Sequence, residues 1–146
     1  MLIPNPLILV NDPELIKRQL KGKIIQSPAL FDLRNDISTD EITPIPALAY
    51  YDQRLGEFVW TGLQCDQVNP IGKGDVLRTG INVVIAGKRY GKGSSREHSP
   101  VAEKSAGIKL VIAESFERIY RQNADNIGLI TSTYMGLVEK ILKCCG

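Results

Sequence analysis

Two short runs of β-branched and aliphatic residues constrain the fold of this chain more than any other feature. The runs are Asn82 to Ala86 and Lys109 to Ala113, and each is followed by turn residues and then by helical sequence. Short, continuous apolar runs are typical of strands that are buried on both faces, as in parallel sheets. The alternation of strand and helix therefore predicts an α/β fold with parallel strand pairs.

Weaker patterns predict further elements along the chain. Asp12 and Pro13 are suited to begin a helix that runs through Leu20, and Gly22 is suited to end it. Residues 27–57 are rich in proline, aspartate and threonine, which indicates a long loop. The other elements that we expect are strands at Lys23–Gln26 and Phe58–Leu63, a third apolar stretch at Ile127–Ile130, and helices at Ser99–Gly107, at Phe116–Asn126 with Ser115 as its cap, and at Leu137–Leu142.

The composition favours one ordinary globular domain over residues 1–146, with residues 1–22 as a peripheral lead-in. Hydrophobic residues make up 43% of the chain and charged residues 23%. No apolar run approaches the roughly 20 residues of a membrane helix. The formal net charge of +2 is too balanced for a dedicated nucleic-acid-binding protein. We therefore expect neither a membrane nor a nucleic acid as a partner.

The cysteines point to a reducing, cytoplasmic setting. There are three of them, Cys65, Cys144 and Cys145, and no two form a C-x-x-C pair. Adjacent cysteines rarely form a disulfide with each other, because the short ring is strained. A zinc or iron–sulfur site built wholly from this chain is therefore not expected.

The densest chemical signal is the basic, glycine-rich loop between the first apolar run and the following helix. Residues 87–98 read GKRYGKGSSREH. Glycines allow close approach of a ligand to the backbone, and amides at a helix N-terminus favour anions. Ser94 and Glu97 have the spacing of a capping box, and Pro100 predicts a break between a first turn at 95–98 and the main helix. The loop therefore suits a carboxylate or phosphate ligand.

Other chemistries fit this loop less well. Gly93 separates Lys92 from Ser94, so the loop is not a P-loop, and no G-x-S-x-G nucleophile elbow occurs. His98 is the one histidine, and its spacing from Ser94 offers no obvious base geometry for a hydrolase triad. On spacing alone, an anion site and a plain capped connection remain equally open.

Two motifs, taken in order, resemble those of the aconitase superfamily. The segment Gly91 to His98 reads GKGSSREH and resembles the G-x-G-S-S-R-E-H signature of the family's swivelling domain. Residues 36–44 read DISTDEITP and are similar to the family's D-x-x-T-D-x-I-x-P. The resemblance extends over residues 23–142 and implies a three-layer β/β/α swivelling domain.

The resemblance implies an enzyme subunit that acts with a partner. Family members dehydrate and rehydrate a hydroxy-di- or tricarboxylate, and the small subunit of 3-isopropylmalate dehydratase consists of this domain on its own chain. A large partner subunit is then expected to carry a [4Fe-4S] cluster that binds the substrate hydroxyl, and this chain is expected to bind no cofactor itself. The reaction implied first is the interconversion of 3-isopropylmalate and 2-isopropylmalate.

The resemblance also assigns roles to individual residues. Ser94 matches the serine that removes the carbon-bound proton, and Ser95 and Arg96 match residues that bind a substrate carboxylate. A guanidinium offers a planar fork for such a carboxylate. Asp40 matches an active-site aspartate, and Arg54 is the nearest candidate for a substrate-binding arginine.

Two alternative functions remain open. Residues 45–51 lack the Ala-Arg-Tyr-Leu continuation of isopropylmalate-type chains, so the chain could instead be the small subunit of an aconitate hydratase or another hydro-lyase. From a different class, it could be a non-catalytic anion-binding or regulatory module. Ser94 and Arg96 favour the enzyme, because a binding module need not retain both.

Overall fold

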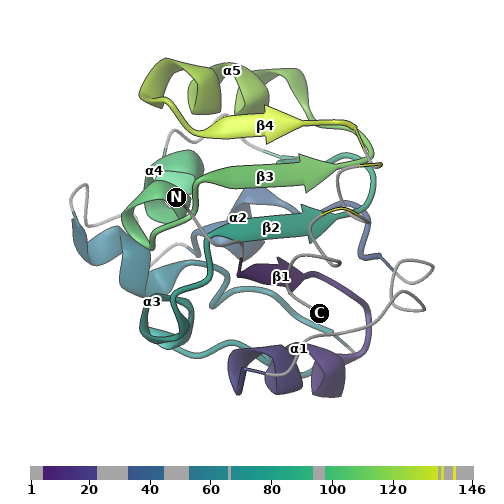
Figure 1. Ribbon diagram of the computed structural model, residues 1–146, viewed down its shortest axis with the longest axis vertical. Coiled ribbons are helices and arrows are strands. Elements are labelled where there is room, and N and C mark those ends of the chain that lie inside the picture. The colour runs from purple at the N-terminus through teal and green to yellow at the C-terminus, as the bar shows by residue number, and fades with distance from the viewer. Residues whose placement is uncertain are drawn as a thin grey trace.

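A four-stranded parallel sheet forms the centre of the protein. The computed structural model describes residues 5–22, 33–44, 53–65, 67–93, 98–134, 136 and 140. The strands are β1 (Pro6–Ile8), β2 (Val83–Ala86), β3 (Leu110–Ala113) and β4 (Ile130–Ser132), and they lie side by side in that order. All four point in the same direction (Figure 1), with Val84 paired to both Leu7 and Val111. The predicted parallel α/β fold is confirmed.

Helices connect the strands and cover the sheet. α1 lies beside β1 at one edge of the sheet and α5 beside β4 at the other (Figure 1). α4 connects β2 to β3 and packs against α5, α2 and η3. The bounds are α1 (Pro13–Leu20), α2 (Thr39–Ile42), η3 (Gln53–Phe58), α3 (Asp75–Thr79), α4 (His98–Ser105) and α5 (Arg118–Ile127), where η3 is a 3-10 helix. Among the described residues, no helix has the length and apolar character needed to cross a membrane.

The start of the chain is part of the core, so the expectation of a peripheral lead-in over residues 1–22 is wrong for residues 6–10. Leu7, Leu9 and Val10 are fully buried. The edge strand β1 is closed by α1, because the amide side chain of Gln19 pairs with the backbone of Ile8. Ile8 N donates to Gln19 Oε1 at 2.6 Å, and Gln19 Nε2 donates to Ile8 O at 2.7 Å. The side chain thus takes the place of a neighbouring strand.

The helix that carries Gln19 begins and ends close to the predicted positions. Asp12 is its N-cap and accepts a hydrogen bond from Glu14 N at 3.0 Å, and Pro13 is its first residue. Gly22 follows the last turn with a φ of +91°. Local sequence signals decide these boundaries.

The predicted strand at Phe58–Leu63 is wrong. The segment contains the end of η3 and then a series of turns, with Trp60 at a φ of 56°. Two tight backbone contacts require this shape: a Cβ on Gly62 would lie 2.5 Å from Asp40 O, and a Cβ on Gly56 would lie 2.8 Å from the backbone of Ser105. The apolar residues of the segment are packed by tertiary contacts instead, and Trp60 is fully buried.

The helices predicted after the glycine-rich loop are present. The described part of α4 runs from His98 to Ser105 and contains Pro100. α5 begins at Arg118 rather than Phe116, and Ser115 does not cap it, because Ser115 Oγ accepts a hydrogen bond from Arg89 N at 2.9 Å. Gly128 ends α5 as expected. The strand predicted at 23–26, most of the first turn predicted at 95–98 and most of the helix predicted at 137–142 lie outside the described residues.

Replacing Gln19 with leucine should lower the free energy of unfolding by about 2–4 kcal/mol, because two buried backbone groups of Ile8 would lose their partner. Denaturation with urea measures the loss. The control is Gln122→Leu, the same change at an exposed position of α5, which should alter stability by no more than about 0.5 kcal/mol. Equal effects of the two substitutions would show that Gln19 does not close the edge of the sheet.

Candidate active site

The structure brings the two motif-bearing segments together. The backbone of residues 34–39 runs beside the glycine-rich loop from Gly87 to Gly93. Asp36 N donates to Lys88 O at 2.8 Å, and Thr39 N donates to Lys92 O at 2.8 Å. In the other direction, Gly91 N donates to Ile37 O at 2.8 Å. Backbone hydrogen bonds therefore fix the register between segments that are far apart in the sequence.

The first part of the loop is held by side chains of residues 34–36. Lys88 N donates to Asn35 Oδ1 at 2.7 Å, and a Cβ on Gly87 would lie only 2.1 Å from that oxygen. Arg89 forms an ion pair with Asp36, with Nη2 at 2.9 Å from Oδ2, and Lys92 Nζ lies 3.8 Å from Asp36 Oδ1. The hydrogen bond from Arg89 holds the pKa of Asp36 below its ordinary value. Asp36 thus offsets part of the positive charge of the loop.

Gly91 is required where it stands for two reasons. Its φ of +87° is a conformation that favours glycine. A Cβ at this position would also lie 2.3 Å from Tyr120 Cγ, so the backbone rests directly on the tyrosine ring of α5. The tight contact fixes how far the loop stands above the helix.

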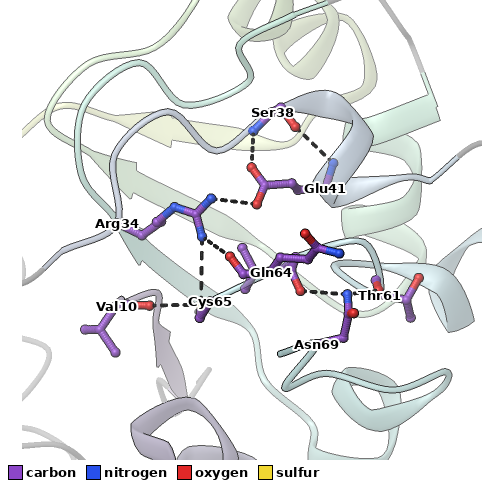
Figure 2. A network of polar contacts seen from close by, with 9 residues as sticks. Val10, Arg34, Ser38, Glu41, Thr61, Gln64, Cys65 and Asn69 are labelled. Atoms are coloured by element: carbon purple, nitrogen blue, oxygen red, sulfur yellow. Dashed lines mark hydrogen bonds and ion pairs between the residues drawn. The ribbon is translucent and has the colours of Figure 1, made fainter. Parts of the chain in front are cut away.

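Asp40 lies in α2, a four-residue helix that the sequence analysis placed within a long loop. Ser38 and Glu41 form a capping box, with Glu41 N donating to Ser38 Oγ and Ser38 N donating to Glu41 Oε1, each at 3.1 Å. Figure 2 shows that Arg34 links this cap to the backbone of Gln64, because its Nη2 donates to Glu41 Oε2 at 2.8 Å and its Nη1 donates to Gln64 O at 2.6 Å. Asp40 itself is exposed. The Ser38-x-x-Glu41 pattern is visible in the sequence and could have predicted this helix start.

The two ends of the predicted catalytic segment both lie beside α2. Ser94, Ser95 and Arg96 lie outside the described residues, which end at Gly93 and resume at His98. On one side, a Cβ on Gly93 would lie 3.4 Å from Thr39 Oγ1. On the other side, Ser99 Oγ lies 2.8 Å from Thr43 Oγ1 and 3.3 Å from Thr39 O, and both contacts are buried.

Arg54 is placed differently from Asp40. It is exposed on η3, and the nearby Gly56 packs against the backbone of Ser105 and Ala106 at the C-terminal end of α4. The predicted serine segment precedes the opposite end of that helix. The role of Arg54 stays a prediction.

A buried carboxylate beneath the loop was missed by the sequence analysis. Glu103 of α4 is fully buried and accepts a hydrogen bond from Tyr90 Oη at 2.5 Å and another from Tyr120 Oη. Trp60 Nε1 donates to Tyr90 Oη at 3.2 Å. Burial raises the pKa of Glu103 to about 7, against the lowering effect of the two tyrosine hydrogen bonds. The sequence holds no local signal for its burial, because neighbouring positions of a helix face different sides and a glutamate is ordinarily exposed.

Comparisons with known proteins agree with this geometry. Residues 77–135 match the family described as the aconitase C-terminal domain. The small subunit of the isopropylmalate/citramalate isomerase of Methanocaldococcus jannaschii is 42% identical to this chain over 108 residues, which cover 73% of the chain and 60% of that relative. The chain is thus similar to the small subunits of aconitase-type enzymes.

Further relatives of the superfamily show the same likeness. The 3-isopropylmalate dehydratase small subunit of Desulfovibrio desulfuricans is 40% identical over 106 residues, which cover 72% of this chain and 60% of that relative. The crystal structure of 3-isopropylmalate dehydratase from Methanocaldococcus jannaschii superimposes with a TM-score of 0.54 at 39% identity, over 66% of this chain and 55% of the other. This likeness confirms the predicted aconitase-type fold. The chain spans 60% of the length of the two curated relatives.

Replacing Gly91 with alanine should destabilise the protein by about 2–5 kcal/mol, because both the positive φ and the clash with Tyr120 oppose a side chain. Gly22→Ala is the matched control: its φ is +91°, but its Cβ would meet nothing within 4 Å. The control should cost only about 1–2 kcal/mol. Chemical denaturation compares the two variants, and equal losses would contradict the contact between the loop and Tyr120.

The stability contributed by Glu103 should depend on pH. In the unfolded chain the carboxyl ionises near 4.5, whereas in the folded protein its pKa is about 7. Protonated Glu103 therefore stabilises the fold below about pH 4.5, and about 3 kcal/mol of this stability is lost as the pH rises through 7.

The difference between the wild type and Glu103→Gln isolates this titration from that of other groups. From about pH 4 to about pH 8, the free energy of unfolding of the wild type should fall by about 3 kcal/mol relative to that of Glu103→Gln. Parallel curves would show that the Glu103 pKa is not raised by folding.

Proposed function

We propose that the chain is the small subunit of an aconitase-type hydro-lyase that interconverts 3-isopropylmalate and 2-isopropylmalate together with a large subunit. The observation that carries this proposal is the backbone pairing of residues 34–39 with the glycine-rich loop. This pairing puts α2, which bears Asp40, beside both ends of the Ser94–Arg96 segment. The names of the curated relatives support the same reaction class.

In this proposal the chain supplies the proton-transfer group and the anion site. Ser94 removes the carbon-bound proton as water is lost from the substrate, and returns a proton as water is added back at the neighbouring carbon. A serine hydroxyl needs help to act as a base, and cationic neighbours and helix-terminal amides stabilise its alkoxide. Ser95 and Arg96 hold a substrate carboxylate, and Asp40 and Arg54 contribute to substrate binding from the facing segments.

The [4Fe-4S] cluster of the proposal belongs to the large subunit, where it supplies the Lewis acid that takes the substrate hydroxyl. Among the residues that the structure describes, no group of three histidine, cysteine or acidic side chains is arranged to hold a metal ion. Cys65 is buried, and its Sγ donates to Val10 O at 3.5 Å. The described residues of this chain therefore do not fit a cluster.

Ser94→Ala should lower kcat about 10²–10⁴-fold in the complex with the large subunit, which is the usual contribution of a positioned acid–base group. KM should change little, because Ser95 and Arg96 remain. Ser95→Ala should instead act mainly on KM. Ser105→Ala, at the far end of α4, is the matched control and should leave both constants near those of the wild type.

The experiment is steady-state kinetics after co-expression with the large subunit encoded in the same genome and anaerobic reconstitution. The substrates are 3-isopropylmalate, citramalate and citrate, and circular dichroism checks the folding of each variant. If only citrate or citramalate is turned over, the substrate in the proposal would be wrong, but the reaction class would be right. A cluster-loaded complex that hydrates none of them, or a Ser94→Ala variant with normal turnover, would contradict the proposal.

A further inference from the structure

A single buried carboxylate joins three segments that surround the proposed site. Glu103 comes from α4, Tyr90 from the middle of the glycine-rich loop and Tyr120 from α5. Each carboxylate oxygen accepts one phenol hydrogen bond: Oε2 from Tyr90, at 2.5 Å, and Oε1 from Tyr120. All three residues are buried, and the segments are therefore linked at one point rather than merely packed together.

Tyr90 is well placed to anchor the loop. The residues on either side, Arg89 and Gly91, both have positive φ, at 58° and 87°, so the chain turns sharply before and after it. Its backbone is also held, because Tyr90 N donates to Ser115 O and Glu117 N donates to Tyr90 O, each at 3.0 Å. The ring meets Tyr120 edge-on, with centroids 5.2 Å apart. A shift of the Tyr90 hydroxyl would therefore be transmitted to the whole loop.

The carboxylate links both sides of the Ser94–Arg96 segment. The loop leads into that segment from Tyr90 through Gly93, and α4 leads out of it from His98 to Glu103. The Tyr90–Glu103 hydrogen bond thus sets how the two ends stand relative to each other. We propose that Glu103 is a positioning residue, which acts through Tyr90 and Tyr120 to hold the catalytic segment in its productive geometry.

The inference rests on the proposed function for its effect on turnover, because a displacement of about 1 Å in a reacting group can cost about 100-fold in rate. Apolar side chains could fill the same space, but they would not fix how the loop, α4 and α5 are oriented relative to one another. Two hydrogen bonds on one carboxylate do fix these three segments together. The titratable groups that face Glu103 from the described loop and from α5 are the phenols Tyr90 and Tyr120, and Trp60 adds its indole N–H through Tyr90.

Three substitutions separate this role from simple filling of the core. Glu103→Met keeps the bulk and removes both acceptors, and Tyr90→Phe removes one hydroxyl and keeps the ring. Glu103→Gln is the conservative rescue, because its amide can accept from one phenol and donate to the other. Tyr134→Phe, at a tyrosine that is 59% exposed, is the matched control for the loss of a hydroxyl.

In the reconstituted complex, Glu103→Met and Tyr90→Phe should lower kcat about 10–100-fold with KM within about threefold, and Glu103→Gln should recover most of kcat. The double variant Glu103→Met with Tyr90→Phe should be no slower than Glu103→Met alone, because the two residues act as one unit. Additive losses, or a Tyr90→Phe enzyme with the kcat of the Tyr134→Phe control, would overturn the inference.

Amide hydrogen exchange on the full chain tests the positioning without any turnover. In Tyr90→Phe and Glu103→Met the amides of Gly91 and Lys92, which donate to Ile37 O, should exchange at least about tenfold faster relative to the amides of β2. A uniform change over loop and sheet would mean a global loss of stability and would overturn the inference. If the wild-type complex is inactive but this local change is seen, the proposed function fails and the positioning role stands.

Discussion

The backbone hydrogen bonds between residues 34–39 and the glycine-rich loop are the interaction on which the rest of the site depends. Three of them join Asp36 to Lys88, Thr39 to Lys92 and Gly91 to Ile37, all at 2.8 Å. Backbone pairing is insensitive to the solvent and charge conditions that weaken surface ion pairs. The exposed Arg89–Asp36 ion pair therefore only supplements a contact that the main-chain hydrogen bonds already hold in place.

The loop is held from below as well as from the side. Gly91 rests on the ring of Tyr120, and Tyr90 reaches down to the buried carboxylate of Glu103. On the other side, the capping box of Ser38 and Glu41, tied by Arg34 to the next turn, gives the short helix α2 a fixed start (Figure 2). The loop and α2 are thus each supported by polar contacts of their own, in addition to the backbone hydrogen bond that joins Thr39 to Lys92.

Local patterns in the sequence predicted the elements whose position depends on residues close by in the chain. The β-branched runs became β2 and β3, and Asp12 with Pro13 began α1. The predictions were wrong where contacts between residues far apart in the sequence determine the structure. The segment around Trp60 forms turns because Gly62 must approach the backbone of α2, and Ser115 binds Arg89 instead of capping α5.

The residues of the candidate site were predicted from the sequence motifs, but the contacts that hold the two segments together were not. The position of Asp40 beside the loop follows from pairing between segments that no spacing rule connects. Glu103 was missed because a single glutamate in a helix is read as exposed unless its partners, Tyr90 and Tyr120, are known to meet it. Roles for Ser94, Ser95 and Arg96 came from the family motif and stay predictions.

The central claim is that residues 36–44 and the glycine-rich loop form one substrate site. The most direct test is a crystal structure of this chain assembled with the proposed large subunit and a bound hydroxy-dicarboxylate analogue. We expect the ligand to lie between the two segments, with a carboxylate on Arg96 and Ser95, with Ser94 against the carbon that loses its proton, and with Asp40 facing the same ligand. A ligand bound in the complex without contact to either segment would contradict it.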